Sequence, residues 1–286
     1  MEASNTTAYY HQAINLALDY LHSNLQNDLI LSYVSCIANI SHFHFHRIFK
    51  DKVGESLHQY IRRLRLERAA LLLQTYDIIL IEIAKNTGYQ TQYSLSKAFK
   101  QHFGESPRAY RAKVVHPLRK QSIPPEPDQI PEPMILKADE IQLVYIRIVA
   151  PYGSAIEYDA AWKSLLNHAK NKRLLTKNSE YLGLSLDDPA ITPAARCRFY
   201  ACITTKEKVK PEGPFGSLKL NGGEYAVFSL KGAYEQLNDL YQLIYLYWLP
   251  RSKRNLRSGL PFEKYLNSPD QVAQEELLTE IWLPVS

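Results

Sequence analysis

Apolar residues recur at helical spacing in the first part of the chain. Ala13, Leu16, Ala17, Tyr20 and Leu21 fall on one face of a helix with 3.6 residues per turn. Patterns typical of strands are nearly absent before residue 117. The pattern therefore predicts an all-α first part.

The second part of the chain alternates short strand-like runs with helical stretches. β-branched and aromatic residues cluster in LVYIRIV (143–149), YACIT (200–204), YAVFSL (225–230) and EIWLPV (280–285). Runs of this length and composition are typical of strands. This part is therefore predicted to be α+β.

A proline-rich segment separates the two patterns. It reads HPLRKQSIPPEPDQIPEP and ends at Pro133. Because proline lacks an amide proton and interrupts helices, we expect a semi-extended linker here. The predicted organisation is a first domain at 1–116, a linker at 117–133 and a second domain at 134–286.

The first domain contains an internal repeat. FKDKVGES at 49–56 recurs fifty positions later as FKQHFGES at 99–106, and Tyr60 is matched by Tyr110. A repeat of this length is very improbable by chance. It indicates two copies of one structural unit.

Each copy contains the pattern of a helix-turn-helix unit. Two predicted helices meet at Asn39 in the first copy and at Gly88 in the second, and both residue types tolerate the left-handed conformation of a tight turn. The following helices begin near Ser41 and Thr91, which are suitable N-caps. The first domain is thus predicted to be a double helix-turn-helix.

The segment between the two units, residues 57–75, contains no helix breaker. As one helix it would span roughly 28 Å, which is close to the ~34 Å of one B-DNA turn. A rigid connector of this length can hold two recognition helices in successive major grooves on one face of the duplex. We therefore expect the DNA-binding domain to act as a monomer on double-stranded DNA.

Charge also separates the two parts. Residues 1–120 carry 15 lysines and arginines against 9 aspartates and glutamates, whereas residues 121–286 carry 19 against 20. A basic first domain indicates a polyanionic partner. The chain has no apolar stretch long enough for a membrane helix and no secretory signal, so we expect a cytoplasmic protein with no membrane partner. Three cysteines without a CxxC pair indicate neither a disulfide framework nor a zinc site, and no cofactor is expected.

The motif residues Ile83-Ala84, Gly88-Tyr89, Phe99, Phe103-Gly104 and Pro107-x-x-Tyr110-Arg111 make residues 11–113 resemble the AraC/XylS family of transcription regulators. The resemblance implies recognition helices at about 42–50 and 91–101. By that alignment the base-reading positions are Phe43, His46, Arg47, Gln92, Tyr93, Ser96 and Lys97. Lys50 and Lys100 are better placed to contact phosphates.

The chemistry of these positions suits DNA recognition, because Arg and Lys donate to guanine, Gln pairs with adenine and aromatic rings contact thymine methyl groups. Two other interpretations stay open. His42, His44 and His46 form an HxHxH motif that a metal can bind, but no carboxylate or cysteine ligand is evident beside it, and no metal is expected. The basic residues of the connector are either DNA contacts or its solvated face; they are Arg62, Arg63, Arg65 and Arg68.

The second domain also contains a repeat. Residues 144–152 resemble residues 226–234, and residues 181–189 align with residues 261–269. Two βαββ units predict a pseudo-symmetric domain with a cleft between its halves, which is a natural ligand site. In this alignment Gly183 corresponds to Glu263, so a carboxylate breaks the symmetry.

The segments LDDPAITPAARCRFYACI and PFEKYLNSPDQVAQEELLTEIWLPV make residues 135–285 resemble the GyrI-like (duplicated SHS2) effector-binding domain. The resemblance implies binding of small molecules, often lipophilic cations, by a buried glutamate in the motif that reads PFEKYL here. The candidate ligand-binding residues are Glu263, Tyr152, Trp162, Tyr225, Trp248 and Tyr265. An acid among aromatic faces suits a cationic or amphipathic molecule. The sequence departs from the family at Tyr200, where Asp is common.

An AraC-type domain followed by a GyrI-like domain is the architecture of Rob-like regulators. It implies a sequence-specific DNA-binding transcription regulator with a small-molecule effector, for which RNA polymerase is a further candidate partner. No GxSxG, HExxH, Walker A or GxGxxG motif is present, so no catalytic residue and no enzyme are predicted. The alternatives for the second domain are a protein-interaction module and a weak hydrolase acting on captured small molecules.

Overall fold

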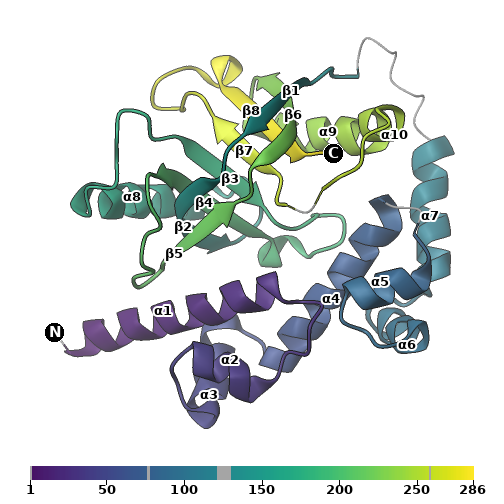
Figure 1. Ribbon diagram of the computed structural model, residues 1–286, viewed down its shortest axis with the longest axis horizontal. Helices are drawn as coiled ribbons and strands as arrows, with labels where there is room; N and C mark the ends of the chain where they lie inside the picture. The colour runs from purple at the N-terminus through teal and green to yellow at the C-terminus, as the bar shows by residue number, and fades with distance from the viewer. Residues whose placement is uncertain (1, 76–77, 121–129, 258) are drawn as a thin grey trace. The chain divides into compact units, whose positions relative to one another are not determined.

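The computed structural model describes all residues except 1, 76–77, 121–129 and 258 (Figure 1). Its described residues form two compact units, a helical one that ends with helix α7 and an α+β one that begins after residue 129. The predicted fold class is confirmed. None of the helices within these residues is long and apolar enough to cross a membrane.

The first unit consists of helices. They are α1 (Glu2–Ser23), α2 (Leu31–Ile37), α3 (His42–Val53), α4 (Leu57–Thr75), α5 (Leu80–Asn86), α6 (Gln92–Phe103) and α7 (Pro107–Lys120). The connector α4 is a single helix of 19 residues, as predicted, and it lies between the pairs α2–α3 and α5–α6 (Figure 1). Phe45 and Phe49 of α3 are fully buried, and so are their counterparts Leu95 and Phe99 of α6.

The two helix-turn-helix turns have the predicted backbone conformation. Asn39 has a φ of 53° and Gly88 a φ of 74°, both in the left-handed region. Thr91 caps α6 through a capping box with Ser94. Ser41 lies at the N-cap position of α3, but its hydroxyl makes no capping hydrogen bond, so that part of the prediction is wrong.

The proline-rich segment differs from the prediction at both of its described ends. Helix α7 continues to Lys120, so residues 117–120 are helical rather than extended. Pro117 lacks the amide proton that would bond to the carbonyl four residues earlier, so the helix continues past this position without that hydrogen bond. At the other end, Ile130 is buried in the core of the second unit. The intervening residues 121–129 lie outside the described residues.

The second unit is built on one eight-stranded sheet in which every neighbouring pair is antiparallel. The strands are β1 (Met134–Ala138), β2 (Ile141–Val149), β3 (Tyr181–Ser185), β4 (Arg198–Thr205), β5 (Phe215–Leu220), β6 (Gly223–Lys231), β7 (Phe262–Tyr265) and β8 (Leu278–Pro284). The helices are α8 (Ala155–Asn171), α9 (Leu237–Leu243), a π-helical turn (Ile244–Trp248) and α10 (Leu249–Arg251). The four predicted strands are confirmed as parts of β2, β4, β6 and β8.

The strand order, β1-β6-β8-β7-β3-β4-β2-β5, reads as two matching halves that meet between β7 and β3. Gly183 of β3 lies directly opposite Glu263 of β7. Because the sequence repeat aligns these same two residues, the pseudo-twofold axis of the domain passes between them. The outer strands are exchanged: β1 precedes the first half but pairs with β6, and β5 precedes the second half but pairs with β2.

Candidate DNA interface and candidate ligand site

The two recognition helices present equivalent residues to solvent. Phe43 at the start of α3 is 82% exposed, and its counterpart Tyr93 in α6 is 76% exposed. The other predicted DNA contacts are exposed except Ser96, which is half-buried; they are His46, Arg47, Lys50, Gln92, Lys97 and Lys100. Exposed aromatic and basic side chains on two equivalent helices form the candidate DNA interface.

Two of these residues come together in a hollow between the helix-turn-helix units. The hollow has a volume of about 810 Å³, and both His46 and Lys97 line it, together with residues of α4. Ser96 is restrained, since its hydroxyl donates to the carbonyl of Gln92 at 2.7 Å. The Ser96 oxygen still has lone pairs that can accept from a base or a bridging water.

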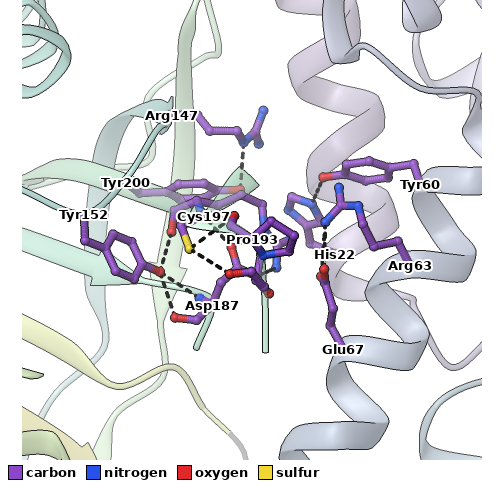
Figure 2. A network of polar contacts seen from close by, with 12 residues as sticks. His22, Tyr60, Arg63, Glu67, Arg147, Tyr152, Asp187, Pro193, Cys197 and Tyr200 are labelled. Atoms are coloured by element: carbon purple, nitrogen blue, oxygen red, sulfur yellow. Dashed lines mark hydrogen bonds and ion pairs between the residues drawn. The ribbon is translucent and has the colours of Figure 1, made fainter. Parts of the chain in front are cut away.

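The connector arginines do not form one solvated face. Arg63 is buried and paired with two carboxylates, with its Nη2 2.5 Å from Glu55 Oε1. Its Nη1 lies 3.1 Å from Glu67 Oε2 (Figure 2). Arg65 is half-buried and hydrogen-bonded, whereas Arg62 and Arg68 are exposed. As for the HxHxH motif, no group of three or more His, Cys, Asp or Glu side chains that could hold a metal is found among the described residues.

Glu263 lies at the centre of the sheet of the second unit and is only 4% exposed. Three hydroxyl groups donate to its carboxylate: Ser185 Oγ to Oε1 at 2.9 Å, Tyr265 Oη to Oε2 at 2.6 Å and Tyr241 Oη to Oε1 at 3.4 Å. Within the described residues no lysine, arginine or histidine forms an ion pair with it.

Burial controls the protonation of this cluster. It raises the pKa of Glu263 above its ordinary value, and the three hydroxyl hydrogen bonds only partly oppose this. Burial, followed by the nearby Glu263 charge, also raises the pKa of Tyr241, Tyr265 and Tyr234. The site therefore has hydroxyl donors that stay protonated and one carboxyl group whose charge is not neutralised by a cationic side chain.

Gly183 leaves the space that this arrangement requires. A Cβ at Gly183 would overlap the Tyr265 hydroxyl and would come within 2.6 Å of the Phe199 ring. A side chain here would displace Tyr265 from Glu263. The break in symmetry between Gly183 and Glu263 thus has a steric cause.

The structure brings some of the predicted ligand-site residues together. The Tyr265 ring lies edge-on to Trp162 of α8, with ring centres 6.1 Å apart. The Tyr152 hydroxyl is held by backbone, donating to the Asp187 carbonyl at 2.9 Å and accepting from the Asp187 amide at 2.9 Å (Figure 2). Only the ring of Tyr152 is left to contact a ligand.

One predicted residue, Tyr225, lies on the other face of the sheet from Glu263. The register from β7 through β8 to β6 places Glu263, Ile281 and Phe228 on one face of the sheet. Tyr225 alternates with that set and packs on the other face against Phe262 and Trp282. Trp248 is the last residue of the π-helical turn, and its ring packs edge-on against Phe228 on the Glu263 face of the sheet, with ring centres 5.0 Å apart. The composition of the sequence grouped these aromatic residues, but alternation along β6 places Tyr225 on the opposite face from Glu263.

Sequence reasoning noted Tyr241 only as one of many aromatic residues in the second half, and it missed three further residues around Glu263: Ser185, Tyr234 and Tyr158. Internal symmetry could have identified two of them, because the repeat aligns Ser185 with Tyr265 and Tyr152 with Tyr234. The Tyr158 hydroxyl is buried without a partner among the described residues, and burial, followed by the Glu263 charge, raises its pKa. Tyr200 lies on the opposite face from Glu263, stacked on Tyr145 with ring centres 4.5 Å apart.

Comparison with known proteins gives a consistent result for both units. The GyrI-like small molecule binding domain matches residues 131–286, and a helix-turn-helix domain matches residues 34–113. The transcriptional regulator Rob of Salmonella typhimurium is 24% identical over 275 residues, which are 88% of this chain and 90% of Rob. The multiple antibiotic resistance protein MarA of Escherichia coli is 32% identical over 125 residues, which are 41% of this chain and 96% of MarA. The cryo-EM structure of an EcmrR–DNA complex covers 90% of this chain and 98% of EcmrR, with 15% identity and a TM-score of 0.47.

Proposed function

This chain belongs to the GyrI-like small molecule binding family and carries an AraC-type helix-turn-helix domain in the Rob-like arrangement, and we propose that it is a regulator controlled by a small organic cation bound at Glu263. That it is a DNA-binding transcription regulator follows from its relatives. The identity of the effector site is the proposed part.

The observation that supports this proposal is the buried carboxyl group of Glu263, which forms no ion pair within the described residues. A carboxylate removed from water is costly unless a cation or several hydrogen bonds compensate it. Hydroxyl donors supply part of that compensation here, and no positive side chain among the described residues supplies the rest. A cationic ligand completes the site electrostatically, and the nearby rings of Trp162 and Tyr234 offer faces for cation–π contact.

On the DNA side we propose that α3 and α6 enter successive major grooves. Phe43, His46 and Arg47 then face one half-site, and Gln92, Tyr93, Ser96 and Lys97 face the other. Lys50 and Lys100, at the later turns of the two helices, contact phosphates. All of these residues except the half-buried Ser96 are exposed, and they occupy matching stretches of the two recognition helices; both observations support the proposed roles.

The effector proposal is tested by calorimetry with phenyltrimethylammonium and its uncharged isostere tert-butylbenzene. Replacing Glu263 with glutamine keeps the shape and removes the charge. We expect Glu263→Gln to weaken binding of the cation about tenfold or more, because a close charge–charge pair in a desolvated site contributes about 1.5 kcal/mol or more. Binding of the neutral isostere should be unchanged.

Glu280→Gln is the matched control. Glu280 lies on β8 with its side chain hydrogen-bonded to Trp282 on the other face of the sheet. The Glu280→Gln substitution removes one negative charge from the same sheet, and it should leave the affinity for the cation at the wild-type value. Equal affinities of the wild type and Glu263→Gln for both probes would overturn the proposal.

A further inference from the structure

Arg65 lies on the connector helix α4. Its guanidinium group is hydrogen-bonded to the turn that leads into α2, the first helix of the first helix-turn-helix unit. Its Nε donates to the carbonyl of Leu25 at 2.9 Å, and its Nη2 donates to the carbonyl of Asn27 at 2.6 Å. Both carbonyls belong to the turn between α1 and α2. The turn is itself fixed, because Leu25 is buried in the core of this unit. Arg65 therefore connects α4 to the fixed turn between α1 and α2.

The same guanidinium group lies against the turn of the second unit. A Cβ on Gly88 would come within 2.6 Å of Arg65 Cζ, far inside van der Waals contact. Glycine suits the φ of 74° at this turn, and a side chain here would also have to displace the Arg65 guanidinium. The next residue, Tyr89, is also close: burial raises the pKa of its hydroxyl, and the charges of Arg65 and Arg62 oppose that rise.

A second arginine of α4 reaches the second recognition helix. Arg62 Nη2 donates to Gln101 Oε1 of α6 at 2.6 Å. Arg62 and Arg65 both line the hollow between the two units. Contacts from one face of α4 therefore restrain the relative placement of the two helix-turn-helix units. Arg62 contacts α6, and Arg65 contacts both the α1–α2 turn, which leads into the first unit, and the Gly88 turn of the second.

We propose that Arg65 is a positioning residue that fixes the separation and rotation of the two recognition helices and so determines which half-site spacing the protein accepts. The inference rests on the proposed binding of both helices to one duplex. A planar guanidinium with two fixed donors restrains angle as well as distance. One base pair added between two half-sites rotates them by about 36° and shifts them by about 3.4 Å. A connector that is rigid at Arg65 cannot follow such a change.

The test uses the full chain and an operator selected from random DNA, together with versions that have one base pair added or removed between the half-sites. We expect the wild type to lose about tenfold or more in affinity at either altered spacing, comparable to a mismatched base pair. Arg65→Met keeps the apolar stem and removes both hydrogen bonds. It should reduce that spacing penalty to about threefold or less, while the ranking of single-base substitutions within each half-site stays unchanged.

Two further variants keep the result interpretable. Arg68→Met removes the same charge from an exposed position of α4 and should retain the wild-type spacing penalty. Gly88→Ala leaves Arg65 in the chain but displaces its guanidinium, and it should relax the penalty as Arg65→Met does. Thermal unfolding identifies any variant that does not fold.

The outcomes separate the two proposals. An undiminished spacing penalty in folded Arg65→Met or Gly88→Ala would overturn the role of Arg65 and leave two-groove binding intact. A wild-type chain that binds all spacings equally would overturn two-groove binding, and the role of Arg65 with it.

Discussion

Arg47 and Lys97 occupy equivalent positions in the two recognition helices, and both side chains are exposed. As base readers, each should contribute ~1–3 kcal/mol of specific binding, so Arg47→Ala and Lys97→Ala should weaken binding to the selected operator by that amount. Binding to random DNA should change little. Fluorescence anisotropy titrations on both duplexes measure the difference.

Lys100→Ala is the contrasting variant, since Lys100 is placed to contact a phosphate. It should weaken binding to every sequence and lower the salt dependence by about one counterion. If Arg47→Ala weakened specific and random binding equally, Arg47 would be a phosphate contact instead of a base reader.

The raised pKa of Glu263 predicts a pH dependence of ligand binding. Cation binding requires the ionised carboxylate, so the affinity for phenyltrimethylammonium should fall as the pH is lowered through the raised pKa, by up to about tenfold per pH unit. Affinity for tert-butylbenzene should not follow this curve. Calorimetry over a pH series that begins near the ordinary carboxyl pKa of about 4 and is extended upward until the affinity stops changing provides the measurement.

Stability of the ligand-free protein should show the opposite trend. Because the folded pKa lies above the unfolded one, the folded state binds the proton more tightly. The stabilisation is complete below the unfolded pKa and is lost as the pH rises through the folded pKa. Glu263→Gln should remove this dependence in denaturant titrations, and a variant that kept it would assign the effect to another group.

The position of a single residue in the fold could be predicted where a motif or an internal repeat specifies it. The GyrI-like motif PFEKYL implied a buried glutamate at Glu263, and the repeat aligned it with Gly183; the carboxyl group is indeed buried, while its role in ligand binding stays a prediction. Tyr225 was grouped with it on composition, yet it lies on the other face of the sheet. Which face a residue of β6 shares with a residue of β7 depends on the register of two strand pairings, which no local pattern contains.

At the scale of elements, the two recognition helices differ in how they begin. In α6 the Thr91 side chain accepts from the Ser94 amide, and the Ser94 hydroxyl lies near the Thr91 amide, so two otherwise unpaired donors are satisfied. In α3 the third residue is His44, which stacks on Tyr10 and returns no such bond. The sequence offered a hydroxyl at both starts, but only the second start has the reciprocal partner.

This difference predicts unequal costs for the same substitution. Thr91→Ala should reduce the free energy of unfolding of the first unit by ~1 kcal/mol, the usual contribution of an N-cap. Ser41→Ala should cost only a few tenths of that, because its hydroxyl makes no capping bond. Chemical denaturation followed by circular dichroism compares the two, and equal losses would contradict the assigned caps.

Elements with local signals were predicted nearly to the residue, and those defined by distant partners were missed. Helix α4 was expected from its uninterrupted composition and ends where predicted. Strands β1 and β5 were not predicted. Each is a short strand at an edge of the sheet, and each pairs with a strand far away in the sequence: β1 with β6 and β5 with β2. The residues next to it in the sequence therefore give little indication that it forms a strand.

At the scale of the whole molecule, two internal duplications support two different functions. The copies in the first unit are separated by a rigid helix, so their exposed faces stay apart and can contact two places on one long partner. The halves of the second unit share one sheet, so their equivalent residues meet at the axis between Gly183 and Glu263. The first arrangement favours an extended polymer such as DNA, and the second favours a small molecule held at a single point.

The separation of the copies in the first unit predicts the footprint of the full chain on DNA. Helix α4 has 19 residues and therefore spans roughly 28 Å, close to one turn of B-DNA. One chain should protect two stretches about one turn apart on the same face of a selected operator, as measured by hydroxyl-radical cleavage. Sedimentation of the complex should give one chain per duplex. Lys97→Ala should weaken the protection at the α6 half-site more than that at the α3 half-site. Protection of one groove only would contradict two-groove binding. A complex that forms only with two chains would contradict monomeric binding, because a second chain would then supply the contacts that the second helix-turn-helix unit of this chain is proposed to make.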